Sequence, residues 1–156
     1  MKPVVKFIIS VTIPLAVGAV AAFFTTSSVN GWFTTLNKPS FNPPNWLFAP
    51  VWTALYIMMG IAFFIAWKSN AVCEVKRRAI IFFFVQLTLN FLWSFIFFYA
   101  KQPGWALIDI ILLWLSILIT IIFFGKISAA ASWLLVPYIC WVSFATLLNF
   151  SIWKLN

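Results

Sequence analysis

The stretch from Gly31 to Trp52, which reads GWFTTLNKPSFNPPNWLFAPVW, is the only long interruption of apolar sequence in the chain. It holds four of the eight prolines and three of the ten tryptophans. Each proline fixes its own φ and drives the residue before it toward extended backbone. A helix therefore cannot run through Lys38–Pro44, and the sequence predicts a rigid loop bracketed by tryptophans. Long loops in compact proteins are usually functional or disordered, and this composition argues against disorder.

The composition of the 156-residue chain indicates a membrane protein, because 65% of the residues are hydrophobic and 8% are charged. A water-soluble protein of this size cannot bury so much apolar surface, since its surface is large relative to its volume. The formal charge is +8, but the basic residues lie mostly between apolar segments, as at membrane boundaries. They do not form the basic patch that a nucleic-acid binder needs. We therefore expect one integral membrane domain over residues 1–156 and no nucleic-acid partner.

Five apolar segments are each close to the roughly 20 residues that a helix needs to cross a bilayer. The alternating pattern of a membrane β-barrel is missing, so the fold class predicted is an all-α integral membrane protein, a five-transmembrane-helix bundle. The first segment also has the features of a signal peptide, with a candidate cleavage site at Ala19–Ala21; its apolar run is longer than such peptides usually have. A long first loop is expected over residues 26–45. The predicted spans are about Val5–Thr25, Trp46–Trp67, Ala79–Ala100, Trp105–Phe124 and Trp133–Trp153.

Basic residues predict the orientation of these spans. With five spans, seven basic residues share the side of the N-terminus: Lys2, Lys6, Lys68, Lys76, Arg77, Arg78 and Lys126. The other side has three, which are Lys38, Lys101 and Lys154. The positive-inside rule places the N-terminus in the cytoplasm and the first loop outside the cell membrane. The short turn Lys101–Gly104 predicts that the third and fourth helices are antiparallel neighbours.

Few residues in the chain could carry conventional chemistry. There is no histidine, which excludes His-ligated haem and the usual zinc sites, and Cys73 and Cys140 form neither a disulfide framework nor a CxxC site. No catalytic triad, carboxylate pair or phosphate-binding glycine loop can be assembled. Asp109 is the only acidic residue in a span, so ion-coupled transport has little support. We expect no metal and no cofactor, and any chemistry must come from aromatic side chains or a bound ligand.

Stripes of aromatic and hydrogen-bonding residues recur on four of the predicted helices. Core packing explains any single stripe, and tryptophans at span ends are usually interfacial anchors. Four stripes together favour a pocket for a large, flat, mostly apolar ligand with a few polar edges. The stripes are Trp52 and Tyr56; Gln86, Asn90, Trp93 and Phe97; Trp105 and Asp109; and Trp141, Ala145, Leu148 and Asn149.

An ordered series of motifs along the chain carries a family resemblance. They are Trp32-Phe33…Leu36-x-Lys38-Pro39-Ser40-Phe41-x-Pro43-Pro44-x-Trp46, Ala49-Pro50-Val51-Trp52-x-x-Leu55-Tyr56-x-x-Met59-Gly60, Gln86-Leu87-x-Leu89-Asn90-x-x-Trp93, Gly104-Trp105-Ala106-Leu107-x-Asp109 and Pro137-Tyr138-x-x-Trp141-x-x-Phe144-Ala145-Thr146-x-Leu148-Asn149. Over essentially its whole length the chain resembles the translocator protein and tryptophan-rich sensory protein family (TspO/MBR, the peripheral benzodiazepine receptor family).

The resemblance implies a five-helix bundle, commonly a homodimer, with a ligand cavity near the first loop. Members bind tetrapyrroles such as protoporphyrin IX and synthetic isoquinoline carboxamide or benzodiazepine ligands, and bacterial members are associated with photo-oxidation of protoporphyrin. By position, Trp52 and Trp141 are the pocket tryptophans, to which we assign the redox role. The resemblance and the stripes give the ligand-binding residues as Tyr56, Asn90, Trp93, Trp105, Asp109, Ala145 and Leu148.

Two functions follow as expectations. The first is light-dependent oxidative degradation of a free-base porphyrin, with light and oxygen as the other requirements. The alternative is non-enzymatic binding, sensing or transport of porphyrins or other amphipathic molecules. Animal members carry a cholesterol-recognition pattern at the end of the last helix, where this chain has Phe150 in place of the expected tyrosine. The pattern is weak even when intact, and the departure argues against a sterol role. The composition suggests a bacterial plasma-membrane protein.

Overall fold

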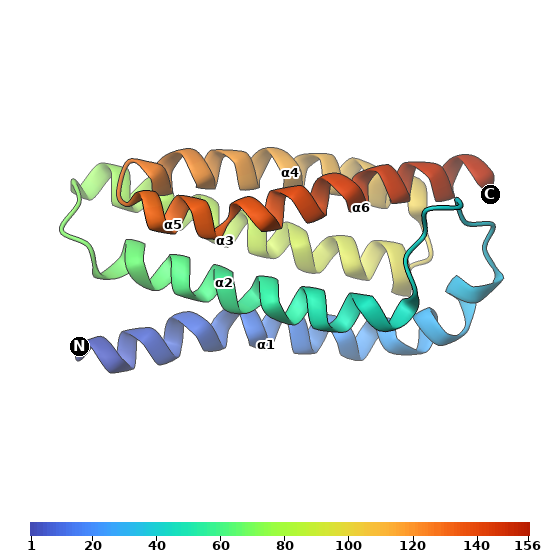
Figure 1. Ribbon diagram of the computed structural model, residues 1–156, viewed down its shortest axis with the longest axis horizontal. Coiled ribbons are helices and arrows are strands. Elements are labelled where there is room, and N and C mark those ends of the chain that lie inside the picture. The colour runs from blue at the N-terminus through green and yellow to red at the C-terminus, as the bar shows by residue number, and fades with distance from the viewer.

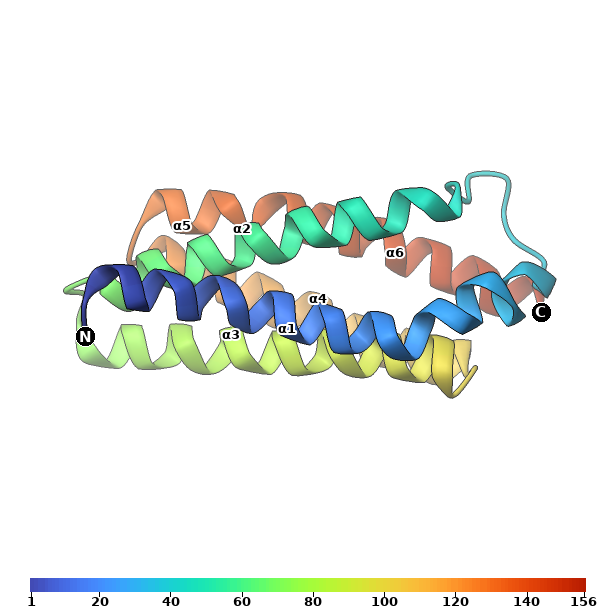
Figure 2. The same ribbon diagram turned by 90° about the horizontal axis from the view of Figure 1, so that it is seen from below.

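A computed structural model describes all residues 1–156 as a bundle of helices without strands (Figure 1, Figure 2). Five helical segments are long and apolar enough to cross a membrane, which confirms the all-α membrane fold. The α-helices are α1 (Pro3–Asn30), α2 (Phe48–Lys68), α3 (Cys73–Ser94), α4 (Pro103–Gly125), α5 (Ala129–Leu134) and α6 (Val136–Leu155). Shorter turns are the 3₁₀ segments η1 (Trp32–Thr35) and η2 (Asn45–Leu47) and the π-helical turn η3 (Phe95–Tyr99).

The two ends of the bundle differ. The N-terminus, the α2–α3 connector and the α4–α5 turn lie together at one end, and the first loop lies at the other with the C-terminus (Figure 1). We call the half of the bundle on the N-terminal side the connector half and the other the loop half. All seven basic residues expected to share a side belong to segments at the end of the connector half. The predicted antiparallel pair is also present, as α3 and α4 pack along each other.

Helix α1 runs beyond its predicted end at Thr25 as far as Asn30. The added turn contains no helix-breaking residue, and the hydroxyl of Thr26 donates to the carbonyl oxygen of Ala22 at 2.6 Å, so its polar side chain is satisfied within the helix. The first loop is therefore shorter than expected. Its Lys38–Pro44 segment is not helical, as its prolines require.

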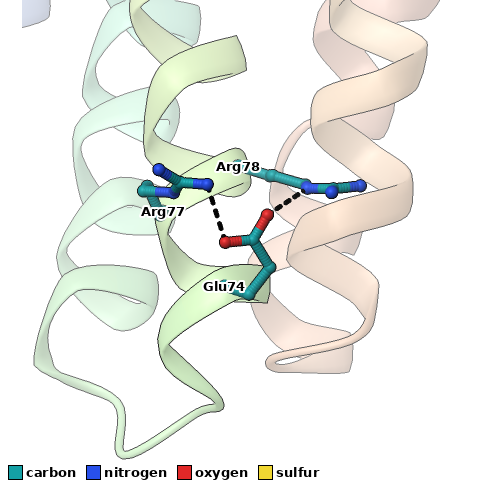
Figure 3. Close-up of polar contacts among 3 residues, drawn as sticks. All are labelled: Glu74, Arg77 and Arg78. Atoms are coloured by element: carbon teal, nitrogen blue, oxygen red, sulfur yellow. Dashed lines mark hydrogen bonds and ion pairs between the residues drawn. The ribbon is translucent and has the colours of Figure 1, made fainter.

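Helix α3 begins at Cys73, ahead of the predicted start at Ala79. The charged segment before the apolar span is therefore helical as well. The Glu74 carboxylate accepts from Arg77 Nη2 at 2.8 Å and from Arg78 Nε at 2.7 Å (Figure 3). Pairs spaced three and four apart meet on one helix face, and an acidic residue suits a helix N-terminus. These side chains are exposed, and exposed pairs contribute little to stability. Their effect is local: they extend α3 past its apolar span.

The last predicted span is divided into α5 and α6, which meet at Leu135. Pro137 occupies the first turn of α6, where a missing backbone N–H is tolerated but a continuous helix is not. The Ser128 hydroxyl caps α5 by accepting from the N–H of Ala131. The break lies in the connector half, so α6 enters the loop half as an unbroken helix.

Helices α1 and α2 approach each other closely at two glycines. A Cβ on Gly60 would lie 2.6 Å from Val11 Cα, and one on Gly18 would lie 2.5 Å from Cε2 of Tyr56. Real Cβ atoms do not approach so closely, so a side chain at either position would force the helices or Tyr56 to move. The absence of side chains at these glycines therefore sets where the Tyr56 ring stands in the bundle.

A candidate ligand cavity in the loop half

The loop half contains a cavity of about 490 Å³ lined by 26 residues, 18 of them hydrophobic. Its volume falls within the roughly 300–1,000 Å³ typical of small-molecule sites. Walls come from α1, α2, α3 with η3, and α6, and the first loop adds Phe33 and Asn45. On the α1 side the lining includes the small residues Gly18, Ala21 and Ala22, which leave space that larger side chains would fill. The cavity lies near the first loop, as expected.

Four aromatic rings follow one another along the cavity. Trp52 stands between Tyr56 and Trp93, with ring centroids 5.7 Å and 6.3 Å away and interplanar angles of 30° and 33°. Trp93 continues to Phe97 at 5.6 Å and 33°. All four rings line the cavity, and because successive ring planes are inclined by only 30–33° they form one aromatic wall. Such a wall suits a flat, aromatic ligand.

Two of the three tryptophans that line the cavity, Trp93 and Trp141, differ in the hydrogen bonding of their indole N–H groups. Trp93 Nε1 donates to Asn149 Oδ1 at 3.0 Å, and Asn149 in turn donates to the carbonyl oxygen of Pro103 at 2.8 Å. Trp141 Nε1 is buried without any partner. An unpaired buried donor is costly, and Trp141 lines the cavity. Because that nitrogen is buried, an acceptor atom on a ligand could reach it only if the indole moved.

The first loop closes the cavity with a buried phenylalanine. Phe33 is 1% exposed, and its ring lies 6.3 Å from Phe48, 6.2 Å from Phe97 and 5.7 Å from Phe98 between centroids. Lys38 contacts the same residue in two ways. Its Nζ donates to the Phe33 carbonyl oxygen at 2.8 Å and lies over the Phe33 ring, 4.8 Å from the centroid. The loop is thus packed as a cover and not as a loose connection.

The same loop is tied to the end of α6. The Asn37 N–H donates to Asn156 Oδ1 at 3.1 Å, and Asn156 Nδ2 donates to the Asn37 carbonyl oxygen at 2.9 Å. Further along, the Phe41 ring lies 6.1 Å from that of Phe144, a cavity-lining residue. These contacts fix the loop at both a polar and an apolar point, so its opening would break both.

A π-helical turn at the end of α3 supplies two more cavity residues. Its i→i−5 bond runs from Ala100 N–H to the Phe95 carbonyl oxygen at 2.9 Å. The Phe98 carbonyl oxygen accepts from the hydroxyl of Ser28 at 2.7 Å, which joins α1 to the turn. Phe97 and Phe98, which both lie in this turn, line the cavity. Such turns are frequent at functional sites.

A buried polar layer joins α2, α3 and α6 below the cavity. Tyr56 OH donates to Asn90 Oδ1 at 2.7 Å, and Asn90 Nδ2 donates to Tyr138 OH at 2.8 Å. Tyr138 OH donates in turn to Gln86 Oε1 at 2.7 Å. Polar groups in the membrane interior pair with one another because no water is available to them. Tyr56 is the only member that lines the cavity, so the layer holds that ring in place.

The structure brings together six of the nine residues singled out from the sequence, and it places three elsewhere. Asn90 is buried in the polar layer and does not line the cavity. Asp109 is buried in α4, a helix that contributes no cavity residue. Trp105 is 67% exposed and lines a separate groove. Those that line the cavity are Trp52, Tyr56, Trp93, Trp141, Ala145 and Leu148.

Sequence reasoning missed much of the remaining lining. The α1 wall gave no signal, because small apolar residues look the same whether they face lipid, another helix or a cavity. Phe97 was placed on the correct stripe but not named as a site residue. The loop residue Phe33 lay within a quoted motif, and only its packing shows that it closes the cavity.

Comparison with known proteins identifies the family of the chain over nearly its whole length. The model of the TspO/MBR family matches residues 10–154. The tryptophan-rich protein TspO of Chlorobaculum tepidum is 45% identical, over 99% of this chain and 98% of that protein. The tryptophan-rich protein TspO of Archaeoglobus fulgidus is 44% identical over 98% of both chains. The human translocator protein is 38% identical over 80% of this chain and 75% of its own length. The chain is therefore a multi-pass membrane protein that belongs to the TspO/MBR family.

Proposed function

We propose that the protein binds a free-base porphyrin such as protoporphyrin IX in the loop-half cavity and promotes its photo-oxidative degradation. The observation that carries the proposal is the aromatic wall formed by Tyr56, Trp52, Trp93 and Phe97, whose successive rings are tilted by only 30–33°. A flat macrocycle gains most of its contact area from such a surface.

The polar lining of the cavity suits the other end of a porphyrin. Asn30 and Asn45 line the cavity where α1 and α2 meet the loop. Amide N–H groups are donors to carboxylates. A porphyrin would therefore place its propionates toward the loop and its ring against the aromatic wall.

In this reaction the main role of the protein is to hold the porphyrin next to an electron-donating indole. A porphyrin absorbs light and, when excited, accepts an electron from a neighbouring indole, which leaves a porphyrin radical anion and an indole radical cation. Dioxygen adds to the radical anion, and the adduct returns an electron to the indole, so that the net change is addition of O2 to the macrocycle. Holding the reactants in contact is itself a large part of such catalysis. Trp52 and Trp141 are the electron donors in this scheme, because both line the cavity and come from different walls. The other cavity residues position the ring.

The test is illumination of the protein with bound protoporphyrin IX, using Trp52→Phe and Trp141→Phe variants. Phenylalanine keeps the ring but is a much poorer electron donor, so both variants should lose porphyrin fluorescence more slowly than the parent. Trp153→Phe is the matched control, since that tryptophan lies outside the cavity. If both cavity variants bleach as fast as the parent, the redox assignment is wrong.

A second candidate is transport or sensing of an unchanged ligand, which the name translocator protein of the human relative favours. Mass spectrometry of the ligand recovered after illumination separates the two functions: degradation gives oxidised products, and transport gives intact porphyrin. Uptake into sealed vesicles containing the protein tests transport directly.

The homodimer, the cell-membrane location and the cytoplasmic N-terminus stay predictions. Cross-linking in native membranes tests the first. Labelling of Cys73 with a membrane-impermeant thiol reagent tests the orientation, since Cys73 is exposed at the end of the connector half. A cytoplasmic N-terminus predicts that intact cells protect Cys73 and that permeabilised cells do not.

A further inference from the structure

A second hollow, of about 690 Å³, lies at the end of the loop half and shares no residue with the cavity. We call it the end groove. It is formed where the η1 segment, the α3–α4 turn, the first turns of α4 and the end of α6 meet. Its lining is Trp32, Leu36, Lys101, Gln102, Pro103, Gly104, Trp105, Ile108, Trp153 and Asn156.

The end groove contains a basic side chain and no acidic one. Lys101 supplies a positive charge and Gln102 an amide, and neither side chain has a partner within the protein. The indole of Trp153 packs so closely on Gly104 that a Cβ there would lie 3.1 Å from Nε1. Both acidic residues of the chain are elsewhere, Glu74 in the connector half and Asp109 buried. The groove is complementary to an anion.

Lys101 holds its place at some conformational cost. Its φ of 56° is the only positive φ in the chain, and the left-handed region is unfavourable for residues other than glycine. The turn is fixed by the N–H of Gln102, which donates to the Ile96 carbonyl oxygen at 3.0 Å. A glycine would meet the backbone requirement without strain. A lysine adds a cation at this point in the groove.

The other two lysines near this end are placed differently. Lys38 already donates to the carbonyl oxygen of Phe33 and lies over its ring. Lys154 is exposed near the end of α6 and does not line the groove. Lys101 is therefore the cation available to a ligand there. Lys154 provides a matched comparison with the same charge.

The position of the end groove relative to the membrane indicates which kind of anion could reach it. Helix α4 begins at Pro103 and α6 ends at Leu155, so the groove lies where spans leave the hydrocarbon and lipid headgroups begin. Trp105 and Trp153 are 67% and 48% exposed beside it, as in an interfacial aromatic belt. Toward the membrane centre, α4 and α6 expose Leu112 and Phe150. An acyl chain could follow that apolar surface while its headgroup met Lys101.

We propose that the end groove binds an anionic phospholipid of the leaflet around it, with the phosphate-bearing headgroup at Lys101 and the acyl chains along α4 and α6. Basic pockets between transmembrane helices at the headgroup level are suited to such lipids. A bound lipid would also contact Trp32 and Leu36, which belong to the cover of the cavity. Occupancy of the groove would thus favour the closed loop.

The test is native mass spectrometry of the full-length protein in detergent, titrated with phosphatidylglycerol or phosphatidylcholine of the same acyl chains. We expect phosphatidylglycerol adducts to predominate on the parent. Lys101→Gln should lower phosphatidylglycerol binding about fivefold, the effect of roughly one surface charge. Lys154→Gln should change it less than about twofold, because that charge lies outside the groove.

Three results would overturn the proposal. Equal binding of the two lipids means that the groove does not select a negative headgroup. Equal losses in the two lysine variants mean that only overall charge matters. Displacement of the lipid by millimolar inorganic phosphate means that a free anion, not a lipid, is the occupant. An unchanged denaturant-unfolding midpoint of Lys101→Gln in lipid-free detergent shows that the fold is intact when lipid binding falls.

Discussion

The connector half and the loop half of the bundle contain the same kinds of side chain and pack them differently. In the connector half, the Phe63 and Phe83 rings stack at 4.7 Å and 8°, and Phe83 continues to Phe124 at 6.0 Å and 14°. Fully buried alanines such as Ala62 and Ala79 lie among these helices, so that the rings fill the space between them. In the loop half, alanines and a glycine face about 490 Å³ of open volume.

The difference shows that aromatic content alone does not make a binding site. Rings in the connector half face one another and leave no room, as in a close-packed protein interior. Rings in the loop half line one wall, while small residues of α1 and α6 form parts of the others. The polar layer of Tyr56, Asn90, Tyr138 and Gln86 separates the two halves.

The largest effect on stability should come from Phe83→Ala in the connector half. Phe83 is fully buried between two stacked rings, and its loss would leave a cavity that costs about 3–5 kcal/mol. Phe144→Ala is the matched variant, because Phe144 already borders open volume and loses fewer contacts. It should cost less than half as much in denaturant unfolding in micelles. Equal costs would mean that the loop half is packed as tightly as the connector half.

A smaller loss should follow Asn90→Leu, which breaks the polar layer between the halves. The Tyr56 and Tyr138 hydroxyls would both lose their Asn90 partner, at roughly 1–3 kcal/mol for unsatisfied buried groups. Thr88→Val is the control, since its hydroxyl bonds only to its own helix. The Tyr56 ring would also lose its anchor, so ligand affinity should fall with stability in fluorescence titrations. A variant as stable as the control would show that the layer contributes nothing.

The smallest change in stability should come from replacing Pro43 and Pro44 with alanines. Each proline restricts the unfolded chain by about 0.4–1 kcal/mol where its geometry fits, so the stability loss should be modest. Ligand affinity should fall more than stability, because the loop that carries Phe33 would close the cavity less often. Pro3→Ala, at the start of α1, is the control. Unchanged affinity would make the loop a connector and not a cover.

The sequence was sufficient for the five spans and the loop, because long apolar segments and prolines have local physical consequences, but it named as site residues only six of the 26 that line the cavity. It was insufficient where the answer depends on how a helix is rotated against its neighbours. Trp105 and Asp109 share a stripe four residues apart, but periodicity does not say which way the stripe faces. In the structure Trp105 is exposed and Asp109 is buried away from the cavity. Asn90 was expected at the ligand because its buried partner, Tyr138, could not be placed from the sequence.

The π-helical turn at Phe95–Tyr99 has a consequence for comparing this chain with its relatives. A π-helical turn contains one more residue than the α-helix it replaces, and one residue corresponds to about 100° of rotation. A relative whose third helix is α-helical throughout would align across a gap of one residue here. Its residues beyond the gap would be rotated by about that angle, so the side chains at the positions of Phe97 and Phe98 would face differently from those of this chain. A single-residue deletion in this segment would thus reshape the ligand site while every motif around it stayed intact.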